Sequence, residues 1–380
     1  MGKRQRPQTQ RAVSWAAPTR PANPTAHDSH SIARRPLSRG MLFAILCAAC
    51  LIVAAGYVAW ALLRKQAITS ATPPVPVAVG NSEPAALAAL GKRPHLIIRS
   101  TALGDTFGRI ALVPLDAPDG PRTMTTMQCD RVYVSAGQGI CLAGYRGDVA
   151  AYSAYIFDSN FQTKYTIPLS GLPSRARISP DGRYATMTVF VSGHSYSDGS
   201  FSTQTSLIDL SNGSVIGNLE QFSVTRDGQP FQSIDFNFWG VTFARDSNRF
   251  YATLGTGGKT YLIEGDIKAR QARVLHENVE CPSLSPDNTR VAFKKAVVRD
   301  GQPVWQISVL DLATLSERPL AAETRSVDDQ VEWLDNQHIL YALPDDGPSP
   351  SVGENIWVLP TDGGQPKLFI HKGFSPAVIN

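Results

Sequence analysis

Residues 253–260 read TLGTGGKT and end like the phosphate-binding loop of nucleotide-binding proteins. That loop has the form GxxxxGK[ST], because its first glycine lets the backbone curl and point several N–H groups at the phosphates. Here Thr253 occupies the first position, and residues 261–266 are too short and glycine-broken for the helix that completes such a site. We interpret GGKT as a turn and expect no nucleotide site.

Other catalytic patterns are incomplete. GHSYS at 193–197 comes near the GxSxG elbow of hydrolases, but it ends in Ser197 and lacks the strand-to-helix turn of a parallel sheet that the elbow requires. The seven histidines show no HxxxH or HExxH spacing, and Cys129, Cys141 and Cys281 lack zinc-ligand spacing. We therefore expect no catalytic residues in a linear motif, no metal and no cofactor.

Positive charge is concentrated at the N-terminus. Residues 1–65 contain ten Lys or Arg residues and one acid, Asp28, which leaves 26 basic and 31 acidic residues for the rest of the chain. The net charge of +4 therefore does not describe the folded part, which is slightly acidic. This distribution gives no reason to expect nucleic-acid binding.

Residues 41–63 form a run of 23 residues without a charge, and as a helix of about 35 Å they are long enough to cross a bilayer. A cleaved signal peptide is the alternative, but its apolar part would be unusually long. Most basic residues precede the run, so the positive-inside rule predicts a single-pass cell-membrane protein with a cytoplasmic N-terminus and an extracytoplasmic C-terminal domain. Residues 1–40 are expected to be a disordered basic tail, and residues 64–94 a Pro/Ala-rich stalk.

The five cysteines fit this topology. Cys47 and Cys50 lie in the apolar run, whereas Cys129, Cys141 and Cys281 face the oxidising side, where disulfides persist. Cys129 and Cys141 are the nearest pair in sequence. However, the glycines at 137 and 139 place a hairpin turn past the midpoint that a direct cross-strand bond needs, so both a disulfide and free thiols remain open.

A pattern of short strands repeats from residue 95 onward. Four segments, each with an Asp-containing turn followed by an alternating strand, are RISPDGRYATM (177–187), TFARDSNRFYATL (242–254), SLSPDNTRVAFKK (283–295) and EWLDNQHILYALP (332–344). A second hairpin follows each of them, giving four strands per unit at the period of a β-propeller blade. A degenerate unit covers 129–169. The strands near 95–118 lack a first strand, which GFSPAVIN at 373–380 supplies if it closes the ring.

We predict an all-β fold over 95–380, a six-bladed β-propeller with four-stranded antiparallel blades, preceded by one transmembrane helix over 41–63 and the disordered tail. The repeats resemble the TolB-type propeller family, a WD-like group, and SPDG at 179–182 and SPDN at 285–288 are the best matches. The chain looks most like the membrane-anchored TolB-like proteins of actinobacteria. It departs from TolB itself because it has an anchor and lacks the small α/β domain before the propeller.

Long loops are expected on one face of this propeller. Segments 192–203, 343–355 and 220–240 connect strands that end at the same face, and such loops carry most binding residues in proteins. Aromatic side chains anchor interfaces, so we expect a ligand or partner to bind here through His194, Tyr196, Phe201, Phe238, Trp239, Asp328 and Asp329. The alternative is that the aromatic residues merely cover the top of the channel.

The sequence therefore favours a membrane-anchored, extracytoplasmic, non-catalytic module that binds or scaffolds an envelope protein, a peptide or a cell-wall polymer. The alternative is an enzyme, a lyase or hydrolase acting on a glycan or peptide, whose residues converge from several blades. Fold alone does not choose between them.

Overall fold

The computed structural model describes residues 39–70, 84–146, 150–191, 202–345 and 353–380. The first described element is helix α1 (Arg39–Ser70). Its segment Arg39–Trp60 is apolar and long enough to cross a membrane, as the uncharged run predicts. A short helix, α2 (Pro84–Leu90), precedes the β-strands.

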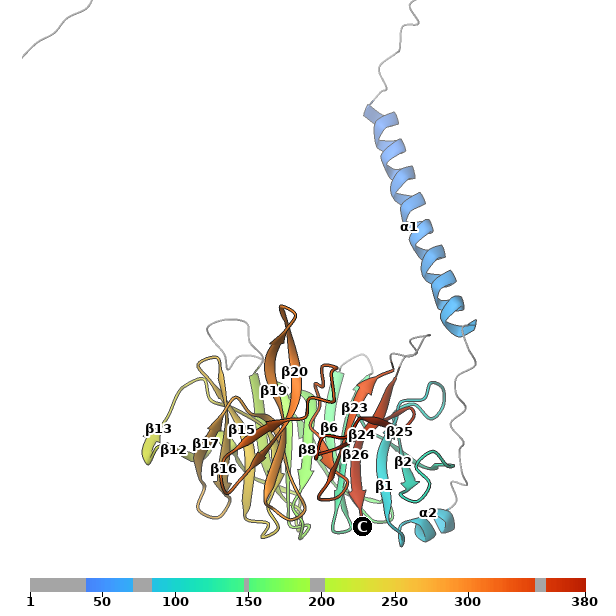
Figure 1. The fold of residues 1–380 in the computed structure, drawn as a ribbon. Helices are drawn as coiled ribbons and strands as arrows, with labels where there is room; N and C mark the ends of the chain where they lie inside the picture. Colours follow the sequence, from blue (N-terminus) through green and yellow to red (C-terminus); the bar gives the residue numbers. More distant parts are fainter. Residues whose placement is uncertain (1–38, 71–83, 147–149, 192–201, 346–352) are drawn as a thin grey trace, which may run out of the picture. The chain divides into compact units, whose positions relative to one another are not determined.

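The strands form six sheets, the blades of a β-propeller (Figure 1). From the innermost strand outward, blades 1 to 3 are β26 (Gly373–Ile379), β1 (His95–Ser100), β2 (Arg109–Pro114) and β3 (Thr123–Gln128); β4 (Arg131–Ser135), β5 (Gln138–Arg146), β6 (Ala150–Asp158) and β7 (Thr163–Leu169); and β8 (Leu172–Ile178), β9 (Tyr184–Val191), β10 (Ser202–Asp209) and β11 (Ser214–Asn218).

Blades 4 to 6 follow the same order. Their strands are β14 (Asn237–Phe243), β15 (Arg249–Thr256), β16 (Lys259–Asp266) and β17 (Gln271–Glu277); β18 (Glu280–Leu284), β19 (Arg290–Arg299), β20 (Gln302–Asp311) and β21 (Glu317–Pro319); and β22 (Glu332–Trp333), β23 (His338–Pro344), β24 (Glu354–Pro360) and β25 (Lys367–Ile370). The predicted six-bladed propeller is confirmed.

The last strand of the chain closes the ring. β26 pairs antiparallel with β1, placing Ile379 opposite His95 and Ala377 opposite Ile97. Each innermost strand contacts the next in circular order, from β26 through β4, β8, β14, β18 and β22 back to β26. The strand that the first blade lacks in sequence therefore comes from the C-terminus, as expected.

The hydrophobic core is divided among the contacts between blades. Six clusters of buried residues each join two neighbouring blades. For example, Ile140 and Ile156 of blade 2 pack with Ile178 and Met187 of blade 3. Because both faces of every blade are covered by neighbours, the strands read as nearly continuous apolar runs, and loss of one blade would expose two clusters.

The two ends of the propeller differ, and we name them for reference. The lower face carries the turns that join the first and second strands of blades 2 to 6, together with the C-terminus and α2. The upper face carries the β15–β16 and β19–β20 turns, and the β19–β20 hairpin projects from it (Figure 1).

Lower-face turns explain the repeated SPD motif. The Asp181 carboxylate accepts hydrogen bonds from Arg183 N at 3.0 Å and from Ser179 Oγ at 2.6 Å, and Ser179 Oγ accepts one from Tyr184 N at 2.9 Å. The corresponding Ser285 and Asp287 of blade 5 make the same contacts. The carboxylates of these aspartates therefore accept hydrogen bonds within their own turns, as expected for such motifs.

Neighbouring blades are also linked along this face. Ser247 Oγ accepts a hydrogen bond from Asp181 N at 3.1 Å, and Asn336 Oδ1 accepts one from Asp287 N at 3.0 Å. Each turn thus supports its own hairpin and the next blade at once.

Blade 4 departs from the expected four strands. The segment 220–240, interpreted from sequence as one long loop, contains a 3-10 turn (Leu219–Gln221) and the hairpin of β12 (Ser223–Arg226) and β13 (Gln229–Phe231). β12 pairs in parallel with β17, so this hairpin extends the outer edge of the blade. The two strands are short, and the turn residues Asp227 and Gly228 between them made the whole segment look like a loop.

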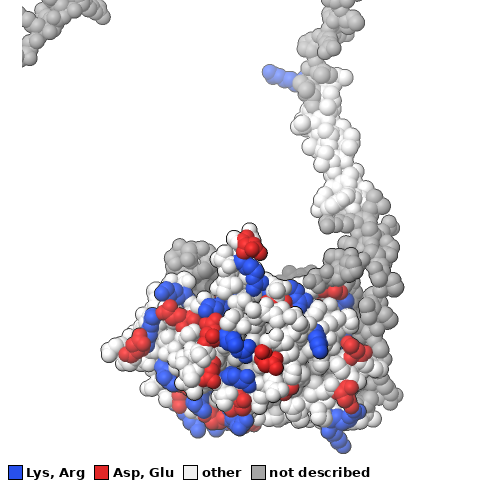
Figure 2. Space-filling model, viewed as in Figure 1, with Lys and Arg blue, Asp and Glu red and all other residues white. Residues whose placement is uncertain are grey.

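Acidic and basic side chains are mixed over the propeller surface in the view of Figure 2. No single sign dominates that side.

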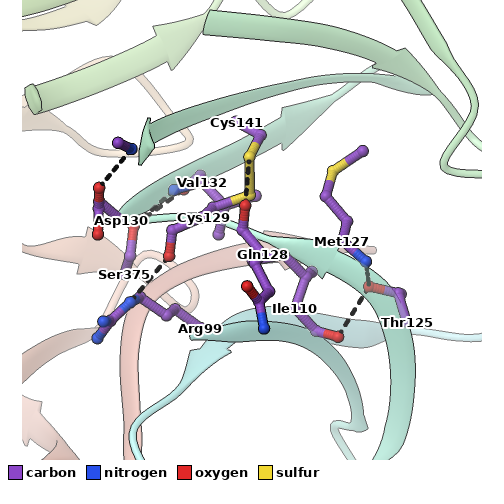
Figure 3. Close-up of a disulfide and its surroundings, with 11 residues drawn as sticks. Arg99, Ile110, Thr125, Met127, Gln128, Cys129, Asp130, Val132, Cys141 and Ser375 are labelled. Carbon is purple, nitrogen blue, oxygen red and sulfur yellow. Dashed lines mark hydrogen bonds between the residues drawn. A yellow bond between two sulfur atoms is a disulfide. The ribbon is translucent and has the colours of Figure 1, made fainter. Parts of the chain in front are cut away.

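A disulfide joins blades 1 and 2 (Figure 3). Cys129 lies in the connection before β4, and Cys141 lies in β5 opposite Val132. The Cα atoms of Cys129 and Cys141 are 5.4 Å apart. The disulfide therefore links a connection to a strand. The sequence prediction considered only a direct cross-strand pair, which this bond does not need. Arg99 Nε donates to Cys129 O at 2.9 Å and holds the same connection.

Candidate functional site at the upper end of the channel

Ionisable side chains and one glutamine meet at the upper end of the channel, where the innermost strands begin. They come from blades 2, 3 and 5 and from the connection between blades 5 and 6. We call the following residues the mouth cluster: Arg131, Arg175, Glu280, Cys281, Lys294, Asp328, Asp329 and Gln330.

Arg131, at the start of β4, pairs with Asp329. Its Nη1 lies 3.4 Å from Asp329 Oδ1, and its guanidinium lies 4.1 Å from the centre of the Phe374 ring. Asp329 Oδ2 also accepts a hydrogen bond from Ala342 N at 3.2 Å. Burial lowers the pKa of Arg131 to about 10, and the nearby Arg175 adds to this shift. Two arginines from different blades therefore lie close together here.

Lys294, in β19, binds acids on two sides. Its Nζ contacts the Asp328 carboxylate and lies 3.9 Å from Glu280 Oε2. Burial lowers the pKa of Lys294, but Cys281, Asp328 and Glu280 outweigh burial and raise it. The Asp328 side chain is 66% exposed, so this ion pair presents a carboxylate to solvent.

Cys281 is buried beside these cations as a free thiol. Its N–H donates to Thr253 Oγ1 at 2.9 Å, and its side chain is one of the groups that raise the pKa of Arg175 against the effect of burial. A Cβ on Gly240 would lie 2.6 Å from Cys281 Cα, so β14 and β18 approach more closely than any larger residue allows. The thiol is thereby held at the wall of the channel.

Two of the expected binding residues, Asp328 and Asp329, belong to the mouth cluster. Phe238 does not reach the surface: it is 1% exposed and part of the core between blades 3 and 4. Trp239 is 8% exposed and packs over Gly255, where a Cβ would come within 2.7 Å of its ring. Both lie in β14 because the strand begins at Asn237, inside the segment interpreted as a loop. His194, Tyr196 and Phe201 lie outside the described residues.

The sequence reading missed the basic residues and the thiol of the cluster. Arg131, Arg175, Lys294 and Cys281 belong to no motif. The sequence did contain an indication of these residues. Arg175 and Arg177 alternate with apolar or small residues in the first strand of a repeat unit, and the first strand of each blade lines the channel of a propeller. Reading polar residues at such positions as channel residues would have found them.

A second polar group lies at the lower end of the channel. Tyr133, Arg177 and Glu332 line a cavity of about 260 Å³. Arg177 Nη2 lies 3.2 Å from Glu332 Oε2, and Tyr133 Oη donates to Glu332 Oε1 at 3.2 Å. Burial raises the pKa of Glu332, although Arg177 opposes the shift. Among the described residues, no group of three or more His, Cys, Asp or Glu side chains is placed to hold a metal ion.

GGKT forms the turn between β15 and β16, as expected, with Thr256 opposite Lys259. Gly257 and Gly258 have φ values of 58° and 71°, which glycine adopts without strain. Asp235 fixes the turn, because its Oδ2 accepts a hydrogen bond from Gly257 N at 2.7 Å.

The protein is a six-bladed β-propeller, and its fold is TolB-like. No family model matches the chain, and no curated protein matches it. Among solved structures it is similar to TolB from Acinetobacter baumannii, with a TM-score of 0.51 and 17% identity, covering 75% of this chain and 66% of that chain. It is also similar to a putative TolB from Agrobacterium tumefaciens, with a TM-score of 0.45 and 11% identity over 74% of this chain and 90% of that chain. A puromycin hydrolase variant has a TM-score of 0.45 and 14% identity, over 73% of this chain and 43% of that chain. At such identities the likeness is one of fold.

Proposed function

We propose that this chain is a membrane-anchored binding protein whose propeller lies outside the cytoplasm. In this proposal the upper face binds an envelope protein, a peptide or a cell-wall polymer without catalysis, and the anchor is the segment 41–63. The observation that carries it is the mouth cluster, in which side chains from four parts of the ring gather at one opening.

Two features support the topology. Helix α1 contains a segment that can cross a membrane, and the basic residues before it favour a cytoplasmic N-terminus. The buried Cys129–Cys141 disulfide suits an oxidising compartment, because cytoplasmic thiols are kept reduced.

The charge pattern of the mouth supports a polar partner with both signs of charge. Arg131, Lys294 and Asp328 belong to one cluster of both charge signs, and such a cluster favours a peptide or protein segment that pairs charges with it in one orientation. A purely acidic or purely basic polymer would meet repulsion at part of the ring.

Reversing one exposed mouth charge tests this proposal. We expect Asp328→Arg to reduce crosslinking of a partner in intact membranes by at least about tenfold, because one lost charge pair at a binding site costs on the order of 1.4 kcal/mol or more. The matched control is Asp362→Arg, the same change at an exposed lower-face position, which should leave crosslinking unchanged. Equal crosslinking by the two variants would refute a role for the mouth.

An enzyme remains the second candidate, and the lower cavity favours it. There burial raises the pKa of the Glu332 carboxyl group, as a general acid needs, and Tyr133 and Arg177 hold that group in place although both oppose the shift. Glu332→Gln should then abolish turnover of a wall-derived glycan or peptide while Asp328→Arg does not. Turnover that survives Glu332→Gln would exclude this version.

A further inference from the structure

Blade 4 carries an insertion that the four-strand pattern of the other blades does not contain. Between β11 and β14 the chain forms the 3-10 turn Leu219–Gln221 and the hairpin of β12 and β13. Figure 1 shows this hairpin at the outer edge of the propeller. Segments that are not needed to close a fold commonly carry binding residues. The insertion is therefore a candidate location for a site outside the mouth cluster.

A cavity of about 520 Å³ lies in this insertion, and we call it the blade 4 cavity. Its volume falls in the range of small-molecule sites, ~300–1,000 Å³. The described residues that line it come from the 3-10 turn and its C-cap, from β13 and from the connection to β14: Glu220, Phe222, Phe231, Gln232, Ser233, Ile234 and Phe236. Ile234 is 91% exposed, so the lining includes an apolar side chain that is open to solvent.

Three phenylalanine rings of this lining are each held by a deeper aromatic ring. The pairs and the distances between their ring centres are Phe222 with Phe250 at 5.8 Å, Phe231 with Tyr261 at 5.9 Å, and Phe236 with Phe238 at 5.9 Å. All three pairs meet edge to face, which is a favoured arrangement of aromatic rings. The deeper rings are at most 3% exposed and belong to the core between blades 3 and 4. The lining rings are therefore held in place before any ligand binds.

Two of the lining rings form a corner. The centres of the Phe231 and Phe236 rings lie 5.2 Å apart, and the two ring planes meet at 59°. A group in the blade 4 cavity can therefore contact both rings at once. The face of an aromatic ring carries partial negative charge and attracts a cation within about 6 Å of its centre. Two such rings together favour a cation over an anion.

The charges around the cavity are negative on balance. Glu220 is the one charged side chain among the described residues that line it. A second carboxylate, Asp235, lies in the same connection and accepts a hydrogen bond from the lining Ser233 Oγ at 2.5 Å. Hydrogen bonds, foremost one from a backbone N–H, lower the pKa of Asp235 to about 2, so this group is ionised at neutral pH. Arg226 lies 5.9 Å from the centre of a lining ring, but its Nη2 pairs with Glu277 Oε1 at 2.6 Å.

We propose that the blade 4 cavity binds a substituted ammonium group, such as the trimethylammonium of choline. A quaternary ammonium has no N–H to donate, so ring faces and a nearby carboxylate are the groups that recognise it. A neutral group of the same shape gains the apolar contact without the electrostatic attraction, and an anion is repelled by the carboxylates. This site is separate from the mouth cluster, and the inference does not rest on the proposed function of the upper face.

The test compares choline with dimethylbutanol, its neutral analogue in which carbon replaces nitrogen. Both are titrated calorimetrically, at constant ionic strength, into the full-length chain in dodecyl maltoside micelles, which contain no ammonium group. We expect choline to bind at least about tenfold more tightly than the analogue. Glu220→Gln should reduce the affinity for choline by about threefold or more and leave that for the analogue unchanged, because the carboxylate attracts only the cation. Phe231→Leu should also weaken choline binding, because it keeps an apolar side chain but removes a ring face.

Two control variants make matched changes outside the cavity lining. Asp227→Asn neutralises a carboxylate of the β12–β13 turn that is 93% exposed, and Phe107→Leu replaces a phenylalanine of the β1–β2 connection that is 38% exposed. Both variants should keep the preference for choline. Glycerophosphocholine distinguishes the sources of the ligand. Binding as tight as that of choline would identify a lipid headgroup, and weaker binding a free small molecule.

Equal binding of choline and its neutral analogue would overturn the proposal. Unchanged choline binding by Glu220→Gln and Phe231→Leu chains that melt at the original temperature would do the same. If Phe231→Leu does not fold, the comparison with Glu220→Gln still decides the question. Failure of this site is separable from failure of the proposed function, because a chain that binds no choline but still crosslinks a partner through the mouth loses only the blade 4 site.

Discussion

The lower-face turns and the mouth cluster use the same residue types in opposite ways. At the lower face, Asp181 and Asp287 accept hydrogen bonds from their own turns, so they have little capacity left for a ligand. At the mouth, Asp328 faces solvent beside Lys294, and Arg175 keeps an unfilled donor. The difference shows that the local backbone decides whether an aspartate in this fold is hydrogen-bonded within its own turn or left exposed to solvent.

The largest expected effect concerns the disulfide, which holds an upper-face connection covalently. Replacing both Cys129 and Cys141 by serine should lower the free energy of unfolding by about 2–4 kcal/mol, because the unfolded chain regains the freedom of a closed loop. Thermal melts with and without reductant measure this. Reductant should lower the melting temperature of the original chain and leave that of the double variant unchanged. A double variant as stable as the original would show that blades 1 and 2 are held without the covalent link.

A smaller effect is expected at the lower-face turns. Ser179→Ala removes a buried hydroxyl that donates to Asp181 and accepts from Tyr184 N, which should cost about 1–2 kcal/mol. Ser285→Ala makes the same change in blade 5 and should cost a similar amount. Denaturant melts compare the two. If Asp328→Asn at the mouth lowered the free energy of unfolding as much as either serine variant, the proposed difference between the two faces would be wrong.

The smallest effect sharpens the comparison within the upper face. Hydrogen bonds from Gly257 N, Ser233 and Thr256 lower the pKa of Asp235 from 3.8 to about 2. Because the folded pKa is depressed, this carboxylate stabilises the fold above pH 3.8 and loses that contribution as the pH falls toward 2.

The variant Asp235→Asn should therefore melt below the original chain at neutral pH, by less than about 1 kcal/mol since the group is partly solvated. The difference in stability between the variant and the original chain should narrow between pH 4 and pH 2. Asp227→Asn, whose side chain is 93% exposed, is the control and should show no such narrowing. A gap that is constant with pH would mean that the carboxylate charge does not fix the GGKT turn.

Much of the fold was predictable because each blade repeats one physical pattern. The Asp turns and alternating strands gave the blade number, and the C-terminal GFSPAVIN indicated the ring closure that β26 and β1 confirm. The hairpin of β12 and β13 was missed since its strands are short and separated by Asp227 and Gly228, which look like loop residues.

The mouth cluster was only partly predictable. Asp328 and Asp329 were expected at this face because acidic residues border its loops, and the structure places both in the mouth cluster. Arg131, Arg175 and Cys281 lie far apart in sequence and meet only when the ring closes. Phe238 was misplaced because an aromatic residue near a loop looks the same in sequence whether it faces a partner or the core.

Ring closure by β26 sets an order of events for synthesis and export. The first strand of the propeller, β1, finds its inner partner only in residues 373–379, which are synthesised after all the other strands of the propeller that the structure describes. Until those residues arrive, the edge of β1 has unpaired N–H and C=O groups that invite pairing with another chain. If the chain crosses a membrane from its anchor onward, blade 1 stays open until residues 373–379 have crossed, and the ring with its charged mouth closes only then.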